Sequence, residues 1–319
     1  MNTIDVLKPG MLTSFQDLGR RGYEHLGVPV NGVMDERAHR VANWLVGNSA
    51  TEATLEITLL GPVLRFNADA VIALCGADLS PTVNQQPIAM NQAVQLAAGS
   101  VLAFGARRAG ARSYLAVQGG YALQPVMGST STYVRGAYGG VDGKALVKGL
   151  RIPLKDPTSK RVVQKLPNAP LFPYGVVQGA AAPIRLVMGR EHASFNPHSV
   201  ASLSSQPYRL SAQSDRMGYR LEGPSLQRDD AYELRSEAVT PGTVQVPPDG
   251  SPIILMADAQ TTGGYPRIAN VISVDLPRLA QRAPGDSLRF EWVDLEAAQR
   301  LWIAQAEVFA RFEHDSCAD

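Results

Sequence analysis

The feature that most constrains the fold is a long succession of short apolar runs, each closed by glycine or proline. The runs include GPVLRF, AVIALCG, SYLAVQG, PIRLVMG, PIILMAD and SLRFEWV. They recur at short, fairly even intervals, which is typical of the strands of a barrel or sandwich. With 29 glycines and 22 prolines among 319 residues, turn-forming residues are plentiful. The chain is therefore predicted to be mainly β with a few helices.

Three segments have the periodicity of amphipathic helices, and these are 34–48, 275–285 and 294–314. In the first, Asp35 is expected to cap the first turn and Gly47 to end the helix. Asp275 is expected to cap the second helix. In the third helix we expect one apolar stripe to pack in the core. The stripe consists of Leu295, Ala298, Leu301, Trp302, Ala306 and Phe309.

Composition excludes several classes of function. The net charge is +1 and no block of like charges occurs, which argues against nucleic-acid binding. The two cysteines, Cys75 and Cys317, cannot build a disulfide framework and fit a reducing compartment. No apolar run approaches the length of a membrane span. The five histidines lack metal-ligand spacing. We therefore expect a cytoplasmic protein that binds no metal, nucleic acid or membrane.

The two halves of the sequence resemble each other. Three pairs of segments match in the same order and at a nearly constant offset, namely 55–66 with 236–247, 72–79 with 253–260, and 97–104 with 283–290. Ordered matches of this kind favour an internal duplication. The predicted domains are a first half at 1–122, a glycine-rich lobe and connector at 123–180, and a second half at 181–319. A ligand cleft is expected where the halves meet.

Polar residues gather in the stretches 14–27, 211–223 and 258–268, and Ser129 and Ser131 lie in a fourth. Each stretch by itself is equally well explained as a hydrogen-bonded turn. Together they offer acids, amides, hydroxyls and guanidinium groups, which suit a small substrate with carboxylate and amide groups. The GGVDGKA segment lacks the spacing of a phosphate-binding loop and is interpreted as a flexible turn rather than an anion nest.

Several long motifs resemble a known family. TSFQDLGRRGYEHLGVPVNGVMDERAHRVANWLVGN opens the chain, and LEITLLGP, GSTST, QSDRMGYRLEGP and PGTVQVPPDGSPIILMADAQTTGGYPRIANVISVDLPRLAQRAPGD follow in order. They are similar to the allophanate hydrolase subunit 2 family, also called the KipA or biotin-dependent carboxyltransferase family. The chain most resembles stand-alone bacterial members of the type found as the C subunit of 5-oxoprolinase. The resemblance implies two cyclophilin-like β-barrel halves related by a pseudo-two-fold duplication.

The resemblance also implies a function. It points to a subunit of an ATP-dependent 5-oxoprolinase, which opens 5-oxo-L-proline to L-glutamate with ATP hydrolysis. The expected partners are subunits A and B, the latter KipI-like, and the chain is expected to be inactive alone. ATP is bound either here or elsewhere in the complex. The sequence has no Met-Lys-Met turn to carry covalent biotin. Two alternatives are a carboxyltransferase component of a biotin-dependent urea or amide carboxylase, and a regulatory partner of a kinase inhibitor protein.

The resemblance to 5-oxoprolinases leads us to assign hypothetical roles to the polar stretches. Asp258 and Asp215 are the candidate catalytic residues, for acid–base work or for orienting water. The candidate substrate-binding residues are Gln16, Asp17, Arg20, Ser129, Ser131, Arg216, Gln260, Thr261, Thr262, Gly263, Gly264 and Tyr265. On this basis Asp258→Ala is expected to abolish activity while leaving thermal unfolding nearly unchanged.

Overall fold

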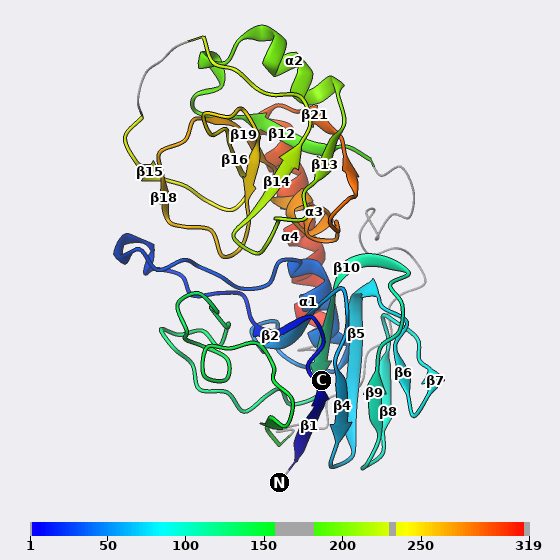
Figure 1. The fold of residues 1–319 in the computed structure, drawn as a ribbon. Helices are drawn as coiled ribbons and strands as arrows, with labels where there is room; N and C mark the ends of the chain where they lie inside the picture. Colours follow the sequence, from blue (N-terminus) through cyan, green and yellow to red (C-terminus); the bar gives the residue numbers. More distant parts are fainter. Residues whose placement is uncertain (1, 157–181, 230–233, 316–319) are drawn as a thin grey trace. The chain divides into compact units, whose positions relative to one another are not determined.

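A computed structural model describes residues 2–156, 182–229 and 234–315 of the chain. The described residues form short strands arranged in barrel-like sheets, together with four α-helices (Figure 1). The prediction of a mainly β protein with a few helices is confirmed. Three short 3-10 helices, at Glu24–Leu26, His192–Ser194 and Ser273–Asp275, lie in connecting segments.

The chain divides into two compact units. The first contains Met1–Arg20, Asn31–Val176 and Val308–Asp319, and the second contains Arg21–Val30 and Val177–Glu307. The described part of the predicted glycine-rich lobe therefore belongs to the first unit. The predicted boundary between connector and second half falls at residues 180 and 181, which lie outside the described residues, so this division stays a prediction.

The first unit is built from two antiparallel sheets. One has the strand order β11-β1-β4-β9-β6-β7, and the other has the order β2-β3-β10-β5-β8. The strands are β1 (Thr3–Lys8), β2 (Leu12–Gln16), β3 (Thr54–Thr58), β4 (Val63–Phe66), β5 (Ala70–Asp78), β6 (Thr82–Val83), β7 (Gln86–Pro87), β8 (Ala93–Leu96), β9 (Val101–Ala103), β10 (Ala109–Val117) and β11 (Arg151–Pro153).

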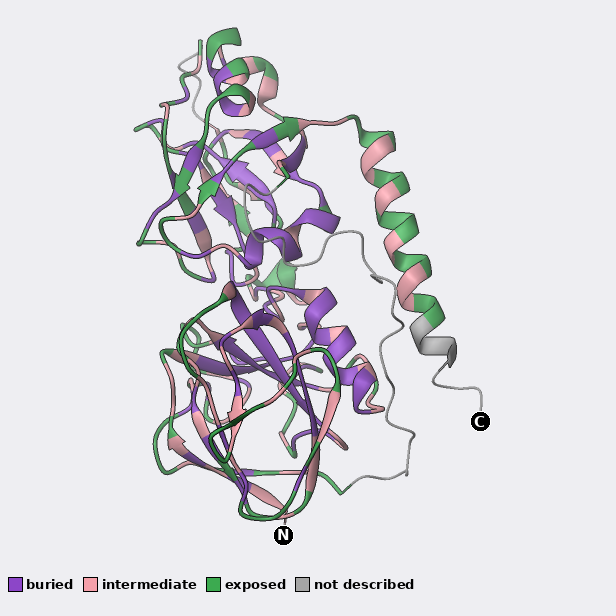
Figure 2. Ribbon diagram, turned by 90° about the vertical axis from the view of Figure 1, so that its right-hand side faces the viewer, coloured by how far each residue is buried: buried purple, intermediate pink, exposed green. Residues whose placement is uncertain are grey.

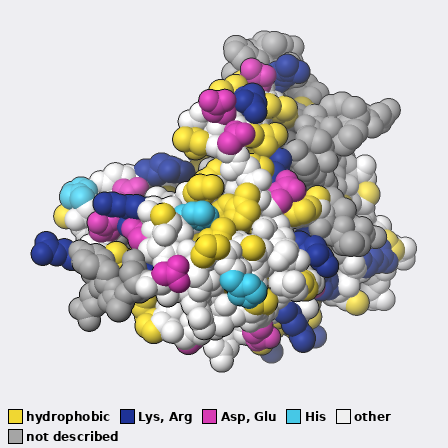
Figure 3. All heavy atoms as spheres, turned by 90° about the horizontal axis from the view of Figure 1, so that it is seen from above, with side chains coloured by type: hydrophobic (Ala, Val, Ile, Leu, Met, Phe, Trp, Pro, Cys, Tyr) yellow, Lys and Arg dark blue, Asp and Glu magenta, His cyan; other side chains and the backbone are white. Residues whose placement is uncertain are grey.

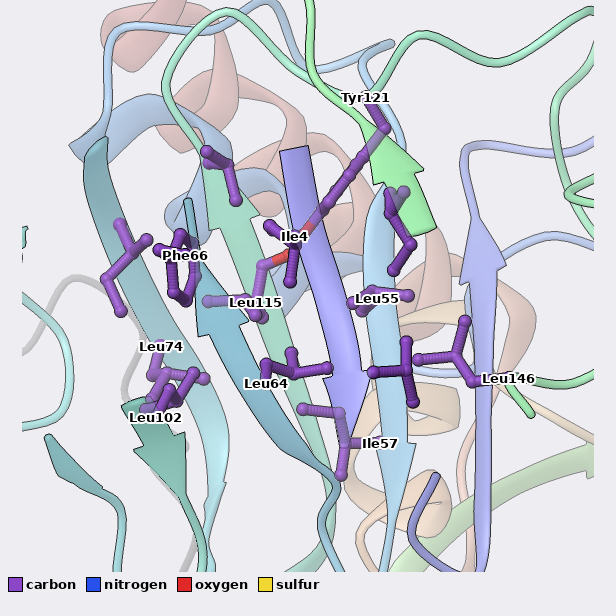
Figure 4. Packing of buried hydrophobic residues seen from close by; sticks show 14 of the residues in the cluster. Ile4, Leu55, Ile57, Leu64, Phe66, Leu74, Leu102, Leu115, Tyr121 and Leu146 are labelled. Atoms are coloured by element: carbon purple, nitrogen blue, oxygen red, sulfur yellow. The ribbon is translucent and has the colours of Figure 1, made fainter. Parts of the chain in front are cut away.

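The core of the first unit lies between these sheets. Ile4 of β1 and Phe66 of β4 come from one sheet, and Leu55 of β3 and Leu115 of β10 come from the other, and all four are fully buried (Figure 4). Burying one such side chain contributes about 1.5–3 kcal/mol. This packing fixes the end of β2, from which the first group of candidate site residues follows.

Helix α1 (Glu36–Leu45) covers the second sheet and forms where the sequence predicts it. The Asp35 carboxylate accepts a hydrogen bond from the Ala38 amide at 3.0 Å, which caps the first turn as expected. Gly47 has a φ of 72°, which suits the chain reversal just after the helix ends. Buried Ala42 and Leu45 belong to a cluster with side chains of β5 and β10.

His39 on α1 is fully buried and gives the first unit a pH-dependent stability. Its ring contacts Thr54 Oγ1 and the Ala50 carbonyl, each at 2.9 Å. Burial lowers the pKa of His39 from 6.5 to about 4, although the Ala50 carbonyl opposes this change. The unfolded chain therefore binds the proton first as the pH falls, and stability is lost between pH 6.5 and pH 4.

We expect this protonation to cost about 3 kcal/mol of unfolding free energy at pH 4 relative to pH 7. Chemical denaturation across that range measures it. In a His39→Gln variant, which cannot take up the proton, the unfolding free energy should depend less steeply on pH. If the unfolding free energy of variant and wild type changes equally with pH, His39 is not the source of the pH dependence.

The second unit contains one long sheet and one small one. The long sheet has the order β20-β13-β14-β17-β16-β19-β12-β21, and the small one pairs β15 with β18. All its pairs are antiparallel except β12 with β21. The strands are β12 (Ile184–Met188), β13 (Tyr208–Leu210), β14 (Gly218–Glu222), β15 (Glu237–Ala238), β16 (Thr243–Gln245), β17 (Ile253–Leu255), β18 (Thr262–Gly263), β19 (Arg267–Val271), β20 (Ser287–Leu288) and β21 (Phe290–Trp292).

Two short helices of the second unit differ from expectation. Helix α2 (Pro197–Ser205) was not predicted, although Asn196 caps it and Pro197 occupies its first turn, a recognisable start signal. Helix α3 (Leu276–Ala280) forms where expected, but the Asp275 side chain does not cap it. The Asp275 carboxylate instead accepts hydrogen bonds from Arg185 at 2.6 and 2.9 Å.

Helix α4 (Leu295–Asp315) is present as predicted, but its expected role as a core helix is wrong. None of its side chains that the structure describes is buried. Leu295 is 63% exposed and Trp302 is 57% exposed, and Ala306 is also exposed. Exposed and half-buried residues run along its whole described length (Figure 2).

The matched halves of the sequence contain strands in both units. The segment 55–66 holds most of β3 and all of β4, and its match holds β15 and β16. Likewise β5 matches β17, and β9 matches β20. The strands do not have equivalent neighbours, because β17 pairs with β14 and β16 whereas β5 pairs with β10 and β8, and neither of these matches β16. The duplication and its pseudo-two-fold relation therefore stay predictions.

Surface and membrane properties add two facts. On the face seen in Figure 3, acidic and basic side chains are interspersed among polar and apolar ones. Within the part of the chain that the structure describes, no helix combines the length and the hydrophobicity needed to cross a bilayer.

Candidate functional site

The first group of predicted site residues is centred on Asp17, just after β2. Its carboxylate accepts hydrogen bonds from the Ser129 and Ser131 hydroxyls, both at 2.6 Å, and from the Thr130 hydroxyl at 3.0 Å. The backbone amides of Thr130 and Gly19 also donate to it. Burial opposes ionisation, but these hydrogen bonds hold the pKa of Asp17 below its usual range. Asp17 therefore fastens the 129–131 turn to the end of β2.

Arg20 also holds the 129–131 turn near the end of β2. Its side chain is 1% exposed, and it donates to Asn31 Oδ1 and to the Ser131 carbonyl, both at 2.5 Å. The guanidinium lies over the Tyr138 ring, 4.7 Å from its centroid. Asn31 and Tyr138 were missed in the sequence. The Asn-Gly pair at 31 and 32 was an available signal, because Asn31 has a φ of 58° that asparagine tolerates.

Gln16 completes this group and is fully buried. Its Nε2 atom donates to Ser14 Oγ at 3.0 Å and to the Thr132 carbonyl at 3.1 Å. Its Oε1 atom accepts no hydrogen bond from the described residues. The structure thus brings five predicted residues together, which are Gln16, Asp17, Arg20, Ser129 and Ser131. The side chains of Asp17 and Arg20 bind protein groups of the same unit.

The glycine-rich lobe does not have the properties of a phosphate site. The amides of Gly140, Gly143 and Lys144 donate to carbonyls of the same lobe rather than converging on an open hollow. Gly139 has a φ of 75°, and a Cβ there would lie 2.0 Å from the Ser131 carbonyl. These residues do not fit the triphosphate of ATP. The glycines instead allow the lobe to pack closely against the Asp17 group.

The second group lies in the second unit and contains a buried ion pair. Arg216 donates to Asp258 through Nε at 3.0 Å and through Nη2 at 2.9 Å. The Asp258 amide donates to the Arg216 carbonyl at 2.8 Å. The two side chains are 8% and 10% exposed. A two-pronged contact of this kind fixes the turn after β17 against the turn before β14.

Asp215, the neighbour of Arg216, is exposed and has a different environment. Its Oδ1 atom accepts from the amides of Met217 at 2.8 Å and Gly218 at 3.2 Å, which is the pattern of an Asx turn. The acid–base roles of Asp215 and Asp258 stay predictions. The geometry around Asp258 favours a positioning role, because Arg216 contacts both of its carboxylate oxygens.

The segment after Asp258 presents polar groups to solvent. The side chains of Gln260, Thr262 and Tyr265 are exposed, Tyr265 by 47%. The Thr261 carbonyl accepts from the Val239 amide, and Thr262 and Gly263 pair with β15. A Cβ on Gly263 would lie 2.5 Å from Gln245 Nε2, so glycine permits a close approach there. Gly264 is exposed. The two-stranded sheet of β15 and β18 therefore holds in place a segment with exposed amide, hydroxyl and phenol groups.

A charged cluster beside this two-stranded sheet was missed in the sequence. Arg267 of β19 donates to Glu191 through Nε at 2.7 Å and through Nη2 at 2.6 Å, and to Glu237 at 2.8 Å. Burial opposes ionisation of Glu191, but Arg267 holds the pKa of that carboxyl below its usual range. Both carboxylates raise the pKa of Arg267. Since Glu237 lies in β15, the cluster anchors the two-stranded sheet of β15 and β18 to the main sheet.

Neither group lines the described cavity, which lies in the first unit. Its volume is about 420 Å³. It is lined by Asn2, Asp69, Ala70, Val71, Gln95, Leu96, Ala97, Val117, Gln118, Leu154 and Lys155. Among the described residues, no three His, Cys, Asp or Glu side chains come together as metal ligands would. The two groups belong to different units, and their meeting in a common cleft stays a prediction.

Comparison with known proteins identifies the family. A family model described as the carboxyltransferase domain, subdomain A and B, matches residues 26–292. The C subunit of 5-oxoprolinase from Escherichia coli (strain K12) is 40% identical over 306 residues, which cover 96% of each chain. The same-named protein of Haemophilus influenzae is 37% identical over 298 residues, covering 93% of this chain and 94% of the relative.

Solved structures agree with this assignment. The crystal structure of the K. lactis urea amidolyase superimposes with a TM-score of 0.89 at 29% identity. The match covers 97% of this chain but 20% of that chain, so the described fold corresponds to one part of a much longer protein. Sequence and structure together confirm the resemblance drawn from the motifs: the chain belongs to the carboxyltransferase-domain family that contains subdomains A and B.

Proposed function

We propose that the chain is a subunit of an ATP-dependent 5-oxoprolinase, and that it acts with two other subunits to open 5-oxo-L-proline to L-glutamate. The observation that carries this proposal is the match to the C subunit of 5-oxoprolinase, which is 40% identical and covers 96% of both chains. Because this relative is named as one subunit of an enzyme, a complete active site need not lie within a single chain.

The proposed reaction defines what the chain has to provide. Water adds to the ring carbonyl carbon, the carbon–nitrogen bond breaks, and the nitrogen takes up a proton. Amide resonance makes that carbonyl a poor electrophile, and ATP hydrolysis in the complex drives the opening. The glycine-rich lobe does not fit a triphosphate, so we assign ATP binding to a partner subunit. This chain would bind the lactam, orient it and help to move the proton.

The exposed turn after β17 supplies suitable groups for this task. Gln260, Thr262 and Tyr265 offer a carbonyl, an amide and two hydroxyls that can hydrogen-bond a lactam N–H and C=O. The exposed carboxylate of Asp215 is the candidate proton acceptor. Buried Asp258 acts through Arg216 to hold both turns in place. The Asp17 group would hold the lobe of the first unit in the same manner.

Reconstitution tests the proposal. The chain is purified with the products of neighbouring genes for the two partner subunits, and glutamate formation from 5-oxoproline and ATP is measured. We expect activity only when all three proteins and ATP are present. A stable three-protein complex that forms no glutamate would refute the proposal.

Substitution of the exposed turn should affect turnover without affecting folding. We expect Gln260→Ala and Tyr265→Phe to lower kcat/KM of the complex by about tenfold or more. Since both side chains are exposed, the melting temperature should change little. Gln206→Ala, which removes an exposed glutamine at the end of α2, is the matched control. Unchanged kcat/KM in both turn variants would place the substrate contacts elsewhere.

The urea amidolyase match favours a second candidate, a carboxyltransferase component of a biotin-dependent carboxylase. This candidate is supported by the superposition on the K. lactis urea amidolyase, which has a TM-score of 0.89 and covers 97% of this chain. A carrier protein would then have to bring the biotin. Mixing the chain with a carrier protein whose biotin is carboxylated, together with urea, distinguishes the two candidates. Only the carboxyltransferase candidate predicts that the carboxyl group moves from biotin to a urea nitrogen, which gives up a proton, without 5-oxoproline.

A further inference from the structure

The cavity of the first unit has the composition of a binding site that the proposed reaction does not use. Its volume of about 420 Å³ is within the range of small-molecule pockets. Its walls come from the start of β1 and β5 and from the ends of β8, β10 and β11. Neither the Asp17 group nor the ion pair of Arg216 and Asp258 contributes a residue to it, so the cavity is separate from the candidate site.

Part of the cavity lining is apolar and reaches the core of the unit. Leu96 is 4% exposed and Val117 is 1% exposed, and both belong to the main core cluster. Ala70 and Leu154 are half-buried and pack against that cluster. A ligand with a hydrocarbon part can bury that part here, and each CH₂ group that is fully buried should tighten binding by about fourfold.

The charged groups at the cavity leave an excess of negative charge. Lys155 donates to both carboxylate oxygens of Glu52, at 2.9 and 2.7 Å, which neutralises its charge. Asp69 has no basic partner among the described residues, because its Oδ1 atom accepts from a backbone amide at 2.8 Å and its Oδ2 atom accepts from none of them. Asp156 adds a further carboxylate, which accepts from the lining Asn2 side chain at 3.3 Å. A cationic ligand is therefore favoured over an anionic one.

Two amide side chains add hydrogen-bond acceptors to the lining. Gln95 and Gln118 line the cavity, and their side chains make no hydrogen bond with any residue that the structure describes. Each offers a carbonyl oxygen, and Asp69 Oδ2 offers a third acceptor, whereas an ammonium group carries three N–H donors. A metal ion fits less well, because no three His, Cys, Asp or Glu side chains come together in the described part of the chain.

We propose that this cavity binds a small primary amine in its ammonium form. The ammonium group donates to Asp69 and to the amide oxygens of Gln95 and Gln118, and the hydrocarbon part lies against Leu96 and Val117. This inference is independent of the proposed 5-oxoprolinase activity, since it requires neither a partner subunit nor ATP.

Ligand-observed NMR titration of the full chain with n-butylammonium chloride, at constant ionic strength, tests the proposal. The expected dissociation constant is about 1 mM. Methylammonium keeps the charge but lacks most of the hydrocarbon, and n-butyramide keeps the hydrocarbon but is neutral. Each should bind at least about tenfold more weakly than n-butylammonium.

Three variants connect the binding to this cavity. Asp69→Asn removes the charge but keeps the Oδ1 acceptor, and should weaken binding by about tenfold or more. Ala97→Trp places a ring at an exposed position of the lining and should abolish binding. Asp249→Asn is the matched control, because Asp249 is exposed in the second unit and its Oδ1 atom likewise accepts a backbone amide, at 2.9 Å. It should leave the dissociation constant unchanged.

Thermal unfolding shows whether each variant is folded. The proposal is overturned if n-butylammonium does not bind the wild type at up to about 50 mM. Binding that a folded Asp69→Asn or Ala97→Trp variant retains at full strength also overturns it, and so does tighter binding of n-butyramide.

Discussion

Asp17→Asn is expected to lower the unfolding free energy by about 3–5 kcal/mol. Five donors converge on the Asp17 carboxylate. Asparagine keeps the shape but turns one oxygen into an NH₂ group, which faces donors and leaves them without an acceptor. The result should be a loss of the contact between β2 and the 129–131 turn. Urea denaturation followed by fluorescence measures the change.

Asp142→Asn is the matched control for this prediction. Asp142 lies in the same glycine-rich lobe, is exposed, and has a φ of 54° that asparagine tolerates. Its effect should stay within about 0.5 kcal/mol. Similar losses in the two variants would mean that the lobe responds to any change of charge, and that Asp17 has no special part in holding it.

Asp258→Ala should cost about 3–5 kcal/mol of unfolding free energy, because it removes the carboxylate that accepts two hydrogen bonds from the buried Arg216 guanidinium. This differs from the sequence-based expectation of nearly unchanged unfolding. The side chains were expected to line an open site, whereas they are 10% and 8% exposed and bind each other. Activity of the reconstituted complex should fall as well, since both turns lose their anchor.

The double variant Asp258→Leu with Arg216→Met separates stability from chemistry. Replacing both partners of a buried pair by apolar side chains is often neutral, so the unfolding free energy should return close to the wild-type value. If activity returns too, Asp258 acts as a positioning residue. Activity that stays absent in a stable double variant would instead show that the carboxylate itself takes part in the reaction.

The sequence predicts the β class and the long helices because these depend on local patterns. Short apolar runs bounded by glycine at close spacing favour strands, and Asp35 caps α1 through a residue only three positions away. Asp275 was assigned wrongly for the opposite reason. Its partner Arg185 is distant in the sequence, and a buried guanidinium outcompetes the helix amides for that carboxylate.

Contacts between residues that are distant in the sequence also limited the prediction of the candidate site. The polar residues around Asp17 and Asp258 were identifiable as unusual, but the sequence does not reveal whether a carboxylate faces solvent or an arginine. Arg267 with Glu191 was missed because each residue is unremarkable in its own segment. For α4 the apolar stripe was correctly seen, but periodicity does not identify what covers a helix.

The parallel pairing of β12 with β21 affects the order in which the two units can fold during synthesis. Ile184 lies opposite Phe290, so one side of β12 stays without a neighbour until the ribosome has delivered most of the chain. By then Arg151 can already pair with Asp5 of β1. Nascent chains should therefore acquire protease resistance in the first unit early, while an open strand edge in the second remains prone to aggregation until translation nears its end.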